Sequence, residues 1–297
     1  MQRPPYPVSR RVVLKAGLLC LGTRSVGRML AEAPAAPPVA RVGLITDIHY
    51  GDKAPAGTRF YRESLGKMDE AVAAFNKERP DFVVELGDLV DRAETVDQEL
   101  EWLATIEKRF SATEAPRHYV LGNHCVDTLT KAEFTAHTAA AKTSHYSFDN
   151  AGFHFVILDA CYRSDGEPYG RKNSDWQDAN VPAAQLQWLR EDLAKTSTPI
   201  VVFAHQRLDV TGQHSVRNAE AVRTLLEQSG RTLVVFQGHS HKNDYQQIHG
   251  IHYVTLVAMI EGSGAENSGY SFLDLMADRS LRVRGFRRQE NRSLTRT

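Results

Sequence analysis

The chain has 297 residues, of which 42% are hydrophobic and 24% charged, so it is long enough for one large α/β domain with a sizeable core. Lysine plus arginine and aspartate plus glutamate number 36 each, and this neutrality argues against a protein that binds nucleic acid polymers through bulk charge. No apolar run reaches the length of about 18 residues that a membrane-spanning helix needs, so we expect no membrane span.

The N-terminal segment differs in composition from the rest of the chain. The run SRRVVLK at 9–15 precedes a weakly apolar segment at 16–22, and an alanine- and proline-rich run follows at 31–40. This order resembles a twin-arginine export leader, with Ala-x-Ala cleavage patterns inside the last run. A disordered basic N-terminus is the alternative, because Arg24 and Arg28 interrupt what should be an uncharged core.

The leader interpretation divides the chain into an export leader with its linker at 1–40 and a folded domain at 41–297. It predicts that the mature protein is periplasmic or otherwise extracytoplasmic after cleavage of the leader. The twin-arginine export machinery would then be a partner of the precursor.

From residue 41 onward, short apolar runs alternate with stretches that carry apolar residues at helical spacing. Strands are predicted at Val42–Ile45, from Phe82 onward and at His118–Leu121. Helices are predicted at Tyr61–Lys77 and Asp97–Phe110. This alternation predicts parallel strands joined by right-handed crossovers.

After residue 124 the pattern changes to a hairpin before the alternation resumes. The hairpin strands are predicted at Tyr146–Phe148 and Phe153–Leu158, and a long polar loop of the kind that often covers an active site at Ser164–Val181. The remaining predicted elements are helices at Pro182–Lys195 and Asn218–Gln228, and strands at Val201–Phe203, Leu233–Phe236, Ile251–Leu256, Tyr270–Leu275 and Leu281–Phe286.

Five of the predicted strands end in short turns that carry Asp, Asn or His side chains. Ligands bind at the carboxyl ends of strands in α/β sheets, so we expect these turns to meet in one site. The turns are Asp47-Ile48-His49, Gly87-Asp88-Leu89-Val90-Asp91, Gly122-Asn123-His124, His205 alone, and Gly238-His239-Ser240-His241.

This ordered set resembles the calcineurin-like metallophosphoesterase superfamily, over roughly residue 41 to the C-terminus. The resemblance implies an α/β fold, a four-layer α/β/β/α sandwich of two packed mixed sheets with the site at one edge. It also implies two divalent metal ions (Mn, Fe or Zn), which carboxylate, amide and imidazole ligands suit. The implied ligands are Asp47, His49 and His241 for one ion, Asn123, His205 and His239 for the other, and Asp88 as the bridge.

The same resemblance implies catalytic roles. A water bridging the two ions loses a proton and attacks phosphorus as metal-bound hydroxide, because two cations lower its pKa. His124 acts near the leaving-group oxygen as an acid or as a donor to the phosphoryl oxygens, and Asp91 orients it. Arg92 matches a phosphate-binding arginine of some members. Cys125 replaces the usual acidic residue, and we expect its thiol to make activity sensitive to peroxide.

Looser similarities concern the substrate. The runs at 57–62, 250–256 and 260–262 are similar to the manganese-dependent ADP-ribose/CDP-alcohol diphosphatase branch. Arg59 or Arg62 would suit a second phosphate. We therefore predict a metal-dependent phosphoric ester hydrolase that cleaves phosphodiester or phosphoanhydride bonds of small molecules, nucleotide-derived ones included.

Three alternatives stay open. One is a broad-specificity phosphomonoesterase, although Asp91 stands where the purple acid enzymes have a tyrosine. Another is a class III cyclic nucleotide phosphodiesterase. The third is a non-catalytic phosphoesterase-fold scaffold; such scaffolds typically lose several ligands, whereas this chain retains the full expected set together with His124.

Other polar residues receive structural interpretations. Glu85 is expected at a partly exposed strand position. The cluster of Arg282, Arg284, Arg287 and Arg288 is expected on a solvated strand face and tail rather than in a phosphate-binding patch. Cys125 and Cys161 could pair in an oxidising compartment, but their sequence positions give no geometry for the bond.

Overall fold

A computed structural model of the protein describes residues 36–295. The compact unit that holds the predicted domain begins at Pro37. The leader motif and its cleavage patterns lie outside the described residues. Within the described part, no helix is long and apolar enough to cross a membrane.

Two six-stranded mixed sheets form the centre of this unit. The first has the order β12-β11-β10-β1-β2-β3, with β1, β2 and β3 parallel. Its strands are β1 (Ala40–Ile45), β2 (Phe82–Glu85), β3 (Arg117–Tyr119), β10 (Gly269–Leu275), β11 (Leu281–Arg287) and β12 (Arg292–Leu294). The second has the order β4-β5-β6-β7-β9-β8, with β5, β6, β7 and β9 parallel. Its strands are β4 (Tyr146–Asn150), β5 (Phe153–Ile157), β6 (Ile200–Phe203), β7 (Thr232–Gln237), β8 (Asp244–Ile248) and β9 (Ile251–Thr255).

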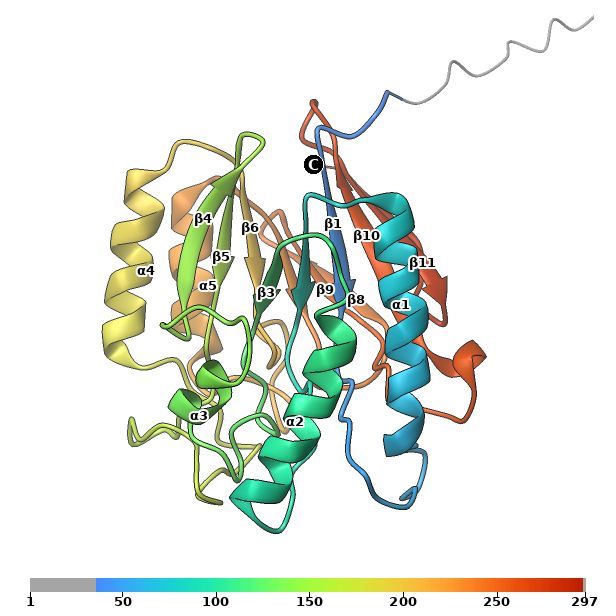
Figure 1. The fold of residues 1–297 in the computed structure, drawn as a ribbon. Coiled ribbons are helices and arrows are strands. Elements are labelled where there is room, and N and C mark those ends of the chain that lie inside the picture. The colour runs from blue at the N-terminus through green and yellow to red at the C-terminus, as the bar shows by residue number, and fades with distance from the viewer. Residues whose placement is uncertain (1–35, 296–297) are drawn as a thin grey trace, which may run out of the picture. The chain divides into compact units, whose positions relative to one another are not determined.

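Helices cover the outer face of each sheet, which gives the four layers seen in Figure 1. A 3-10 turn, η1 (Tyr61–Glu63), leads into α1 (Ser64–Glu78), and α1 packs with α2 (Val96–Phe110) on the first sheet. The helices α4 (Ala183–Lys195) and α5 (Ala219–Ser229) cover the second sheet. The predicted four-layer sandwich is therefore confirmed.

Strand β2 shows why the layers stack in this order. Its side chains alternate between two cores: Val83 contacts the cluster under α1 and α2, whereas Phe82 and Val84 belong to the cluster between the sheets. Both faces of the strand are therefore buried. The expectation that Glu85 is partly exposed was wrong, because Glu85 is fully buried and its Oε1 accepts the Gly87 amide at 2.8 Å. Burial raises the pKa of Glu85 well above its usual value.

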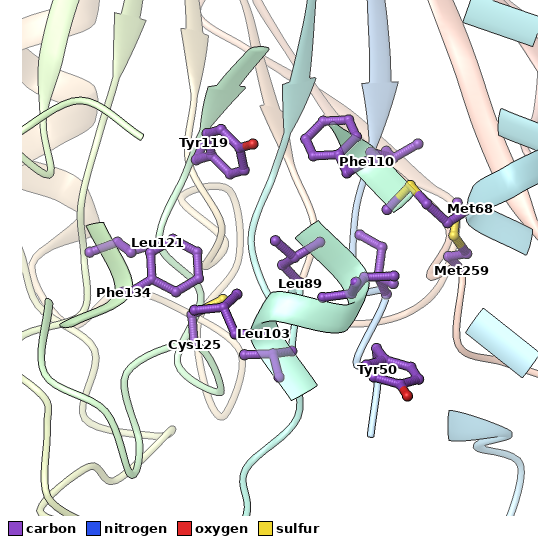
Figure 2. Close-up of a cluster of buried hydrophobic side chains, with 14 of the residues drawn as sticks. Tyr50, Met68, Leu89, Leu103, Phe110, Tyr119, Leu121, Cys125, Phe134 and Met259 are labelled. Atoms are coloured by element: carbon purple, nitrogen blue, oxygen red, sulfur yellow. The ribbon is translucent and has the colours of Figure 1, made fainter. Parts of the chain in front are cut away.

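Both cysteines in the described part are free and buried. Figure 2 shows Cys125 among Leu103, Leu121 and Phe134. Burial raises the pKa of the Cys125 thiol well above its usual value, so the thiolate that peroxide attacks does not form readily. The burial of Cys125 therefore argues against the expected sensitivity to peroxide, which stays a prediction.

The sequence prediction missed one α-helix, two strands and the 3-10 turn η2 (Ala265–Asn267). The helix α3 (Lys131–Ala136) begins at a capping box formed by Thr130 and Glu133. The strands β8 and β12 lie at the edges of their sheets and carry polar residues, so they show no apolar run. Edge strands need bury only one face, which weakens the hydrophobic pattern.

His154 on β5 predicts a pH dependence of stability. Its ring lies between two carboxylates, with Nδ1 2.7 Å from Asp149 Oδ1 and Nε2 2.9 Å from Asp192 Oδ2. The hydrogen bond to Asp192 raises the pKa of His154 despite its burial. A raised folded-state pKa means that the stabilisation is complete below the unfolded value of about 6.5 and is lost as pH rises through the folded value.

We therefore expect the free energy of unfolding in urea to fall between pH 5.5 and pH 8.5, by about 1–2 kcal/mol more in the wild type than in His154→Gln. Equal pH slopes for the two proteins would show that His154 contributes no such linkage.

Candidate metal centre

The ends of β1, β2, β3, β6 and β7 converge, and they carry the predicted ligands. Several of these residues have left-handed backbone conformations, which non-glycine residues rarely adopt. The φ angles are 53° for Asp47, 45° for His49, 62° for Asp88, 68° for His239 and 61° for His241. The backbone of these turns is therefore strained, and binding of a ligand by the clustered side chains would offset this energetic cost.

One carboxylate oxygen of Asp47 faces the other proposed ligands, and hydrogen bonds to the second oxygen hold the side chain in place. Its Oδ2 accepts the hydroxyl of Thr46 at 2.7 Å and the amide of His239 at 3.1 Å. Its Oδ1 lies 3.3 Å from His241 Nε2 and 3.7 Å from His49 Nε2. Burial alone would raise the pKa of Asp47, but the neighbouring His241 and His205 hold it well below its usual value.

Asp88 is arranged in the same way between two groups of ligands. Its Oδ1 accepts the amide of His124 at 2.8 Å. Its Oδ2 lies 3.1 Å from His205 Nε2 and 3.5 Å from His49 Nε2. One oxygen of Asp88 therefore faces a histidine from each predicted ligand set, as a bridging carboxylate must.

Two of the three clusters of potential ligands in the described residues coincide with the predicted sets, and the third joins His49, Asp91 and His124. Donor atoms of Asp47, His49 and His241 lie within 4.8 Å of one another, and so do those of Asp88, His205 and His239. Asn123 lines the same cavity as Asp88 and His239.

Hydrogen bonds to groups outside the site determine which ring nitrogen of His205 and of His241 faces the site. His205 Nδ1 lies 2.8 Å from the carbonyl of Leu86, which can only accept, so this nitrogen carries the proton. His241 Nδ1 lies 2.6 Å from Glu261 Oε1. Both arrangements leave Nε2 available, which is how histidine ligands of metal ions are usually oriented.

The donor set fits two divalent cations. Asn123 Oδ1, His205 Nε2 and His239 Nε2 are buried and make no hydrogen bond. The Nε2 atoms of His49 and His241 lie 3.1 Å apart. That is close to the separation of about 3 Å between neighbouring ligands of an ion with bonds of about 2.1 Å. A cation at each cluster would satisfy all these atoms.

Electrostatics favours the same conclusion. Burial would lower the pKa of His205, but Asp88 and Asp47 raise it to about 9. Burial likewise opposes the charged form of His241, whereas Asp47 raises its pKa to about 9. The carboxylates therefore create a strongly negative potential in a buried space, which attracts cations.

Gly122 gives a stability and binding prediction. A Cβ atom there would lie 2.2 Å from Asp88 Oδ1 and 2.3 Å from the Asp88 amide nitrogen. Gly122→Ala should therefore displace Asp88 and lower manganese affinity by about 10- to 100-fold, measured as metal content after dialysis.

Gly66→Ala is the matched control for this variant, because a Cβ at that helical position meets nothing within 4 Å. We expect it to keep its metal and to gain about 0.5–1 kcal/mol in stability. Unchanged metal content in Gly122→Ala would contradict the close approach of Gly122 to Asp88.

His124 lies outside the two ligand groups and contacts Asp91 through Nδ1. Asp91 Oδ1 also lies 3.5 Å from His49 Nδ1, and Asp91 Oδ2 lies 2.5 Å from Lys53 Nζ. Burial would raise the pKa of Asp91, but hydrogen bonds from His124 and His49 hold it far below its usual value. The predicted Asp91–His124 pair is thus brought together, and Lys53 extends it.

Two adjoining cavities open at the site. The smaller, of about 290 Å³, is lined by Asp88, Asn123 and His124 together with Trp176. The larger, of about 930 Å³, is lined by Lys242 and Arg288 among others. Both cavities share the residues Arg59, His214, His239 and His241.

Of the three arginines expected to bind substrate, the structure brings only Arg59 to the site. Arg62 Nε lies 2.5 Å from Asp52 Oδ1, and its side chain lines neither cavity. Arg92 is exposed and lines neither cavity, because the adjacent Asp91 points inward. The geometry therefore gives no support to the expected roles of Arg62 and Arg92.

The basic cluster near the C-terminus divides into two kinds of residue. Arg284 pairs with Asp274 and Glu78, and Arg287 pairs with Glu70. Arg288 instead lines the larger cavity. Arg288 is nevertheless exposed to solvent, as expected, and it reaches the cavity from the turn that ends β11.

Comparisons with known proteins agree with this geometry. The calcineurin-like phosphoesterase family matches residues 40–243. The chain is 24% identical to a manganese-dependent ADP-ribose/CDP-alcohol diphosphatase from Oryza sativa subsp. japonica, over 85% of this chain and 93% of that protein. It is 24% identical to a protein named a probable cyclic nucleotide phosphodiesterase from Fibrobacter succinogenes, over 68% and 73%.

Solved structures show the same fold. A dimetal phosphatase from Danio rerio superposes with a TM-score of 0.75 at 22% identity, covering 88% of this chain and 100% of that one.

Proposed function

Because this chain belongs to the calcineurin-like phosphoesterase family and is a metal-dependent phosphoric ester hydrolase, we propose that it cleaves the phosphoanhydride bond of a small nucleotide-derived molecule. The observation that carries the metal-dependent chemistry is the position of Asp88 Oδ2, which faces His205 and His49 from the two ligand groups. Mn²⁺ is the proposed cation, because the similar rice protein is named for manganese.

The chain's own residues would hold two cations in the arrangement described above. When bound, such cations polarise phosphoryl oxygens and acidify a water molecule. The residues that line the smaller cavity include no serine, threonine or cysteine, and its carboxylate, Asp88, belongs to a proposed ligand group together with His239. We therefore propose direct attack of water on phosphorus, with inversion and without a phospho-enzyme; trapping a covalent intermediate would contradict this.

His124 is placed to assist the departing group. Its Nδ1 is held by Asp91, so its other ring nitrogen is free to donate a proton or a hydrogen bond in the cavity that His124 lines. Asp91 is in turn fixed by Lys53. The chain Lys53–Asp91–His124 therefore orients the imidazole.

The charge of the larger cavity favours a substrate with a second phosphate. Three basic residues, Arg59, Lys242 and Arg288, line this cavity. Its two carboxylates are already paired: Glu261 with His241, and Glu290 with Arg292. The cavity therefore has excess positive charge next to the metal groups, where the second phosphate of an anhydride would lie.

A cyclic nucleotide is a second candidate substrate, supported by the Fibrobacter succinogenes relative and by the smaller cavity. The test is hydrolysis of ADP-ribose, CDP-choline, a cyclic nucleotide, bis-p-nitrophenyl phosphate and p-nitrophenyl phosphate by protein stripped with chelator and reloaded with Mn²⁺. We expect the two anhydrides to be the best substrates. Turnover of the cyclic nucleotide alone would favour the second candidate, and turnover of the monoester alone a phosphomonoesterase.

Arg59→Gln tests the role of the basic cavity within this panel. We expect it to raise KM for the anhydrides by about tenfold, the effect of losing one charged hydrogen bond, and to leave bis-p-nitrophenyl phosphate little changed. An equal loss on both kinds of substrate would place Arg59 at the attacked phosphate instead.

We also propose that residues 1–40 direct export by the twin-arginine route, which would make the protein periplasmic or otherwise extracytoplasmic. The support is the SRRVVLK run at 9–15 and the Ala-x-Ala patterns that follow it. Cell fractionation of the wild type and of the charge-preserving double variant Arg10→Lys, Arg11→Lys tests this proposal. Export of the double variant, or a mature protein that still begins at residue 1, would contradict it.

A further inference from the structure

One large aromatic side chain is exposed beside the proposed metal groups. Trp176 is 39% exposed, and Val39 is the only other large hydrophobic residue so exposed in the described part of the chain. Trp176 lines the smaller cavity together with Asn123 and His124. Trp176 therefore offers an exposed apolar ring inside the cavity that also holds proposed metal ligands.

The indole is held in place by its neighbours. Tyr169 donates its hydroxyl to the Asp175 carbonyl at 2.6 Å. Asp178 accepts from the Ser164 amide and hydroxyl at 3.1 Å, and it lies 3.3 Å from Arg217 Nε. The residues on either side of Trp176 are thus tied down, which lowers the entropy cost of using the ring for binding.

Trp176 forms a ring cluster with two histidines. Its ring centroid lies 5.4 Å from that of His214 and 5.8 Å from that of His239. His214 lies 5.4 Å from His239 at an interplanar angle of 79°. Trp176 and His214, which we call the aromatic platform, therefore both lie next to the proposed metal ligand His239.

We propose that the aromatic platform binds the planar base of a nucleotide substrate while the phosphate occupies the metal centre. This inference rests on the proposed function and specifies the part of the substrate that determines specificity. Stacking of a base on an aromatic side chain contributes about 1–3 kcal/mol and tolerates different bases, because every base has a π face. The platform thus selects nucleotide derivatives over phosphoesters that lack a ring, and it accepts purines and pyrimidines.

The test compares two non-hydrolysable ligands that share a diphosphonate, α,β-methylene-ADP and methylenediphosphonate. Binding to the Mn²⁺-loaded protein is measured by calorimetry, and Trp176 is monitored by tryptophan fluorescence. We expect the wild type to bind the nucleotide analogue at least about 10-fold more tightly, and Trp176→Ala to lose most of this preference while still binding methylenediphosphonate. Trp176→Phe, which keeps a ring, should retain the preference within about threefold but lose the fluorescence quenching.

Trp188→Phe is the control for fluorescence. Trp188 lies on α4, its ring packs against His145, and it lines neither site cavity. Quenching by the nucleotide analogue should persist in this variant. If Trp176→Ala weakens binding of both ligands equally, Trp176 is a structural part of the loop and the proposal is overturned. An unchanged preference for the nucleotide analogue in this variant would also overturn it. If the metal-loaded wild type binds neither ligand, the proposed function fails and the platform with it, whereas binding without preference overturns the platform alone.

Discussion

Asp88→Asn is expected to lower kcat/KM for every hydrolysed substrate on the order of 10³-fold or more, with loss of bound metal. Asp88 Oδ2 faces both ligand groups, and an amide lacks the negative charge that a bridging ligand supplies. The fold should survive, because the remaining carbonyl oxygen can still accept the amide of His124. The measurements are metal content and turnover after chelation and reloading with Mn²⁺.

Asp278→Asn is the matched control for Asp88→Asn, since it removes a carboxylate from an exposed turn between β10 and β11. It should leave metal content and turnover unchanged. Near-normal turnover in Asp88→Asn would show that Asp88 does not bridge the two groups.

His124→Gln is expected to lower kcat by about 10²- to 10⁴-fold while both metal ions stay bound. His124 lines the cavity and clusters with His49 and Asp91 rather than with either predicted ligand group. We therefore expect its loss to remove a proton donor without removing a ligand. Metal analysis and steady-state kinetics of the same preparation separate this variant from Asp88→Asn.

Asp91→Asn tests how His124 is oriented. Asp91 contacts His124 Nδ1 and Lys53 Nζ, so Asp91→Asn should keep the imidazole but orient it poorly. We expect kcat to fall by about 10- to 100-fold. If His124→Gln lost its metal, His124 would have to be a ligand and the assignment of roles would be wrong.

The residues of the site could be predicted because each lies in a local pattern, whereas their division into two ligand sets was implied by the family resemblance. An apolar strand, a small residue and a polar turn follow one another within a few positions, as at Val84 to Asp88, and parallel strands bring such ends to one edge. The order of these turns along the chain resembles that of the family, and this resemblance predicted the fold.

The supporting residues could not be predicted, because their partners are distant in sequence. Lys53 reaches Asp91 from an irregular loop, and Glu261 reaches His241 across twenty positions. No periodicity marks either residue. Trp176 lay inside a loop that was expected to cover the site, but only the fold shows that its ring lines the cavity.

The exposure of Glu85 was misjudged for a related reason. A single charged residue in an apolar run indicates an exposed position only when one face of the strand meets solvent. Here β2 lies between β1 and β3 with packed layers on both sides, and Glu85 is satisfied in part by the Gly87 amide.

The most direct test of the account is a titration of metal-stripped protein with Mn²⁺, following bound metal and hydrolysis of the best substrate in the panel together. The two ligand groups, joined by Asp88, predict that turnover reaches its maximum only when two ions are bound per chain. Full turnover with one ion bound, or turnover without metal, would contradict the dinuclear site.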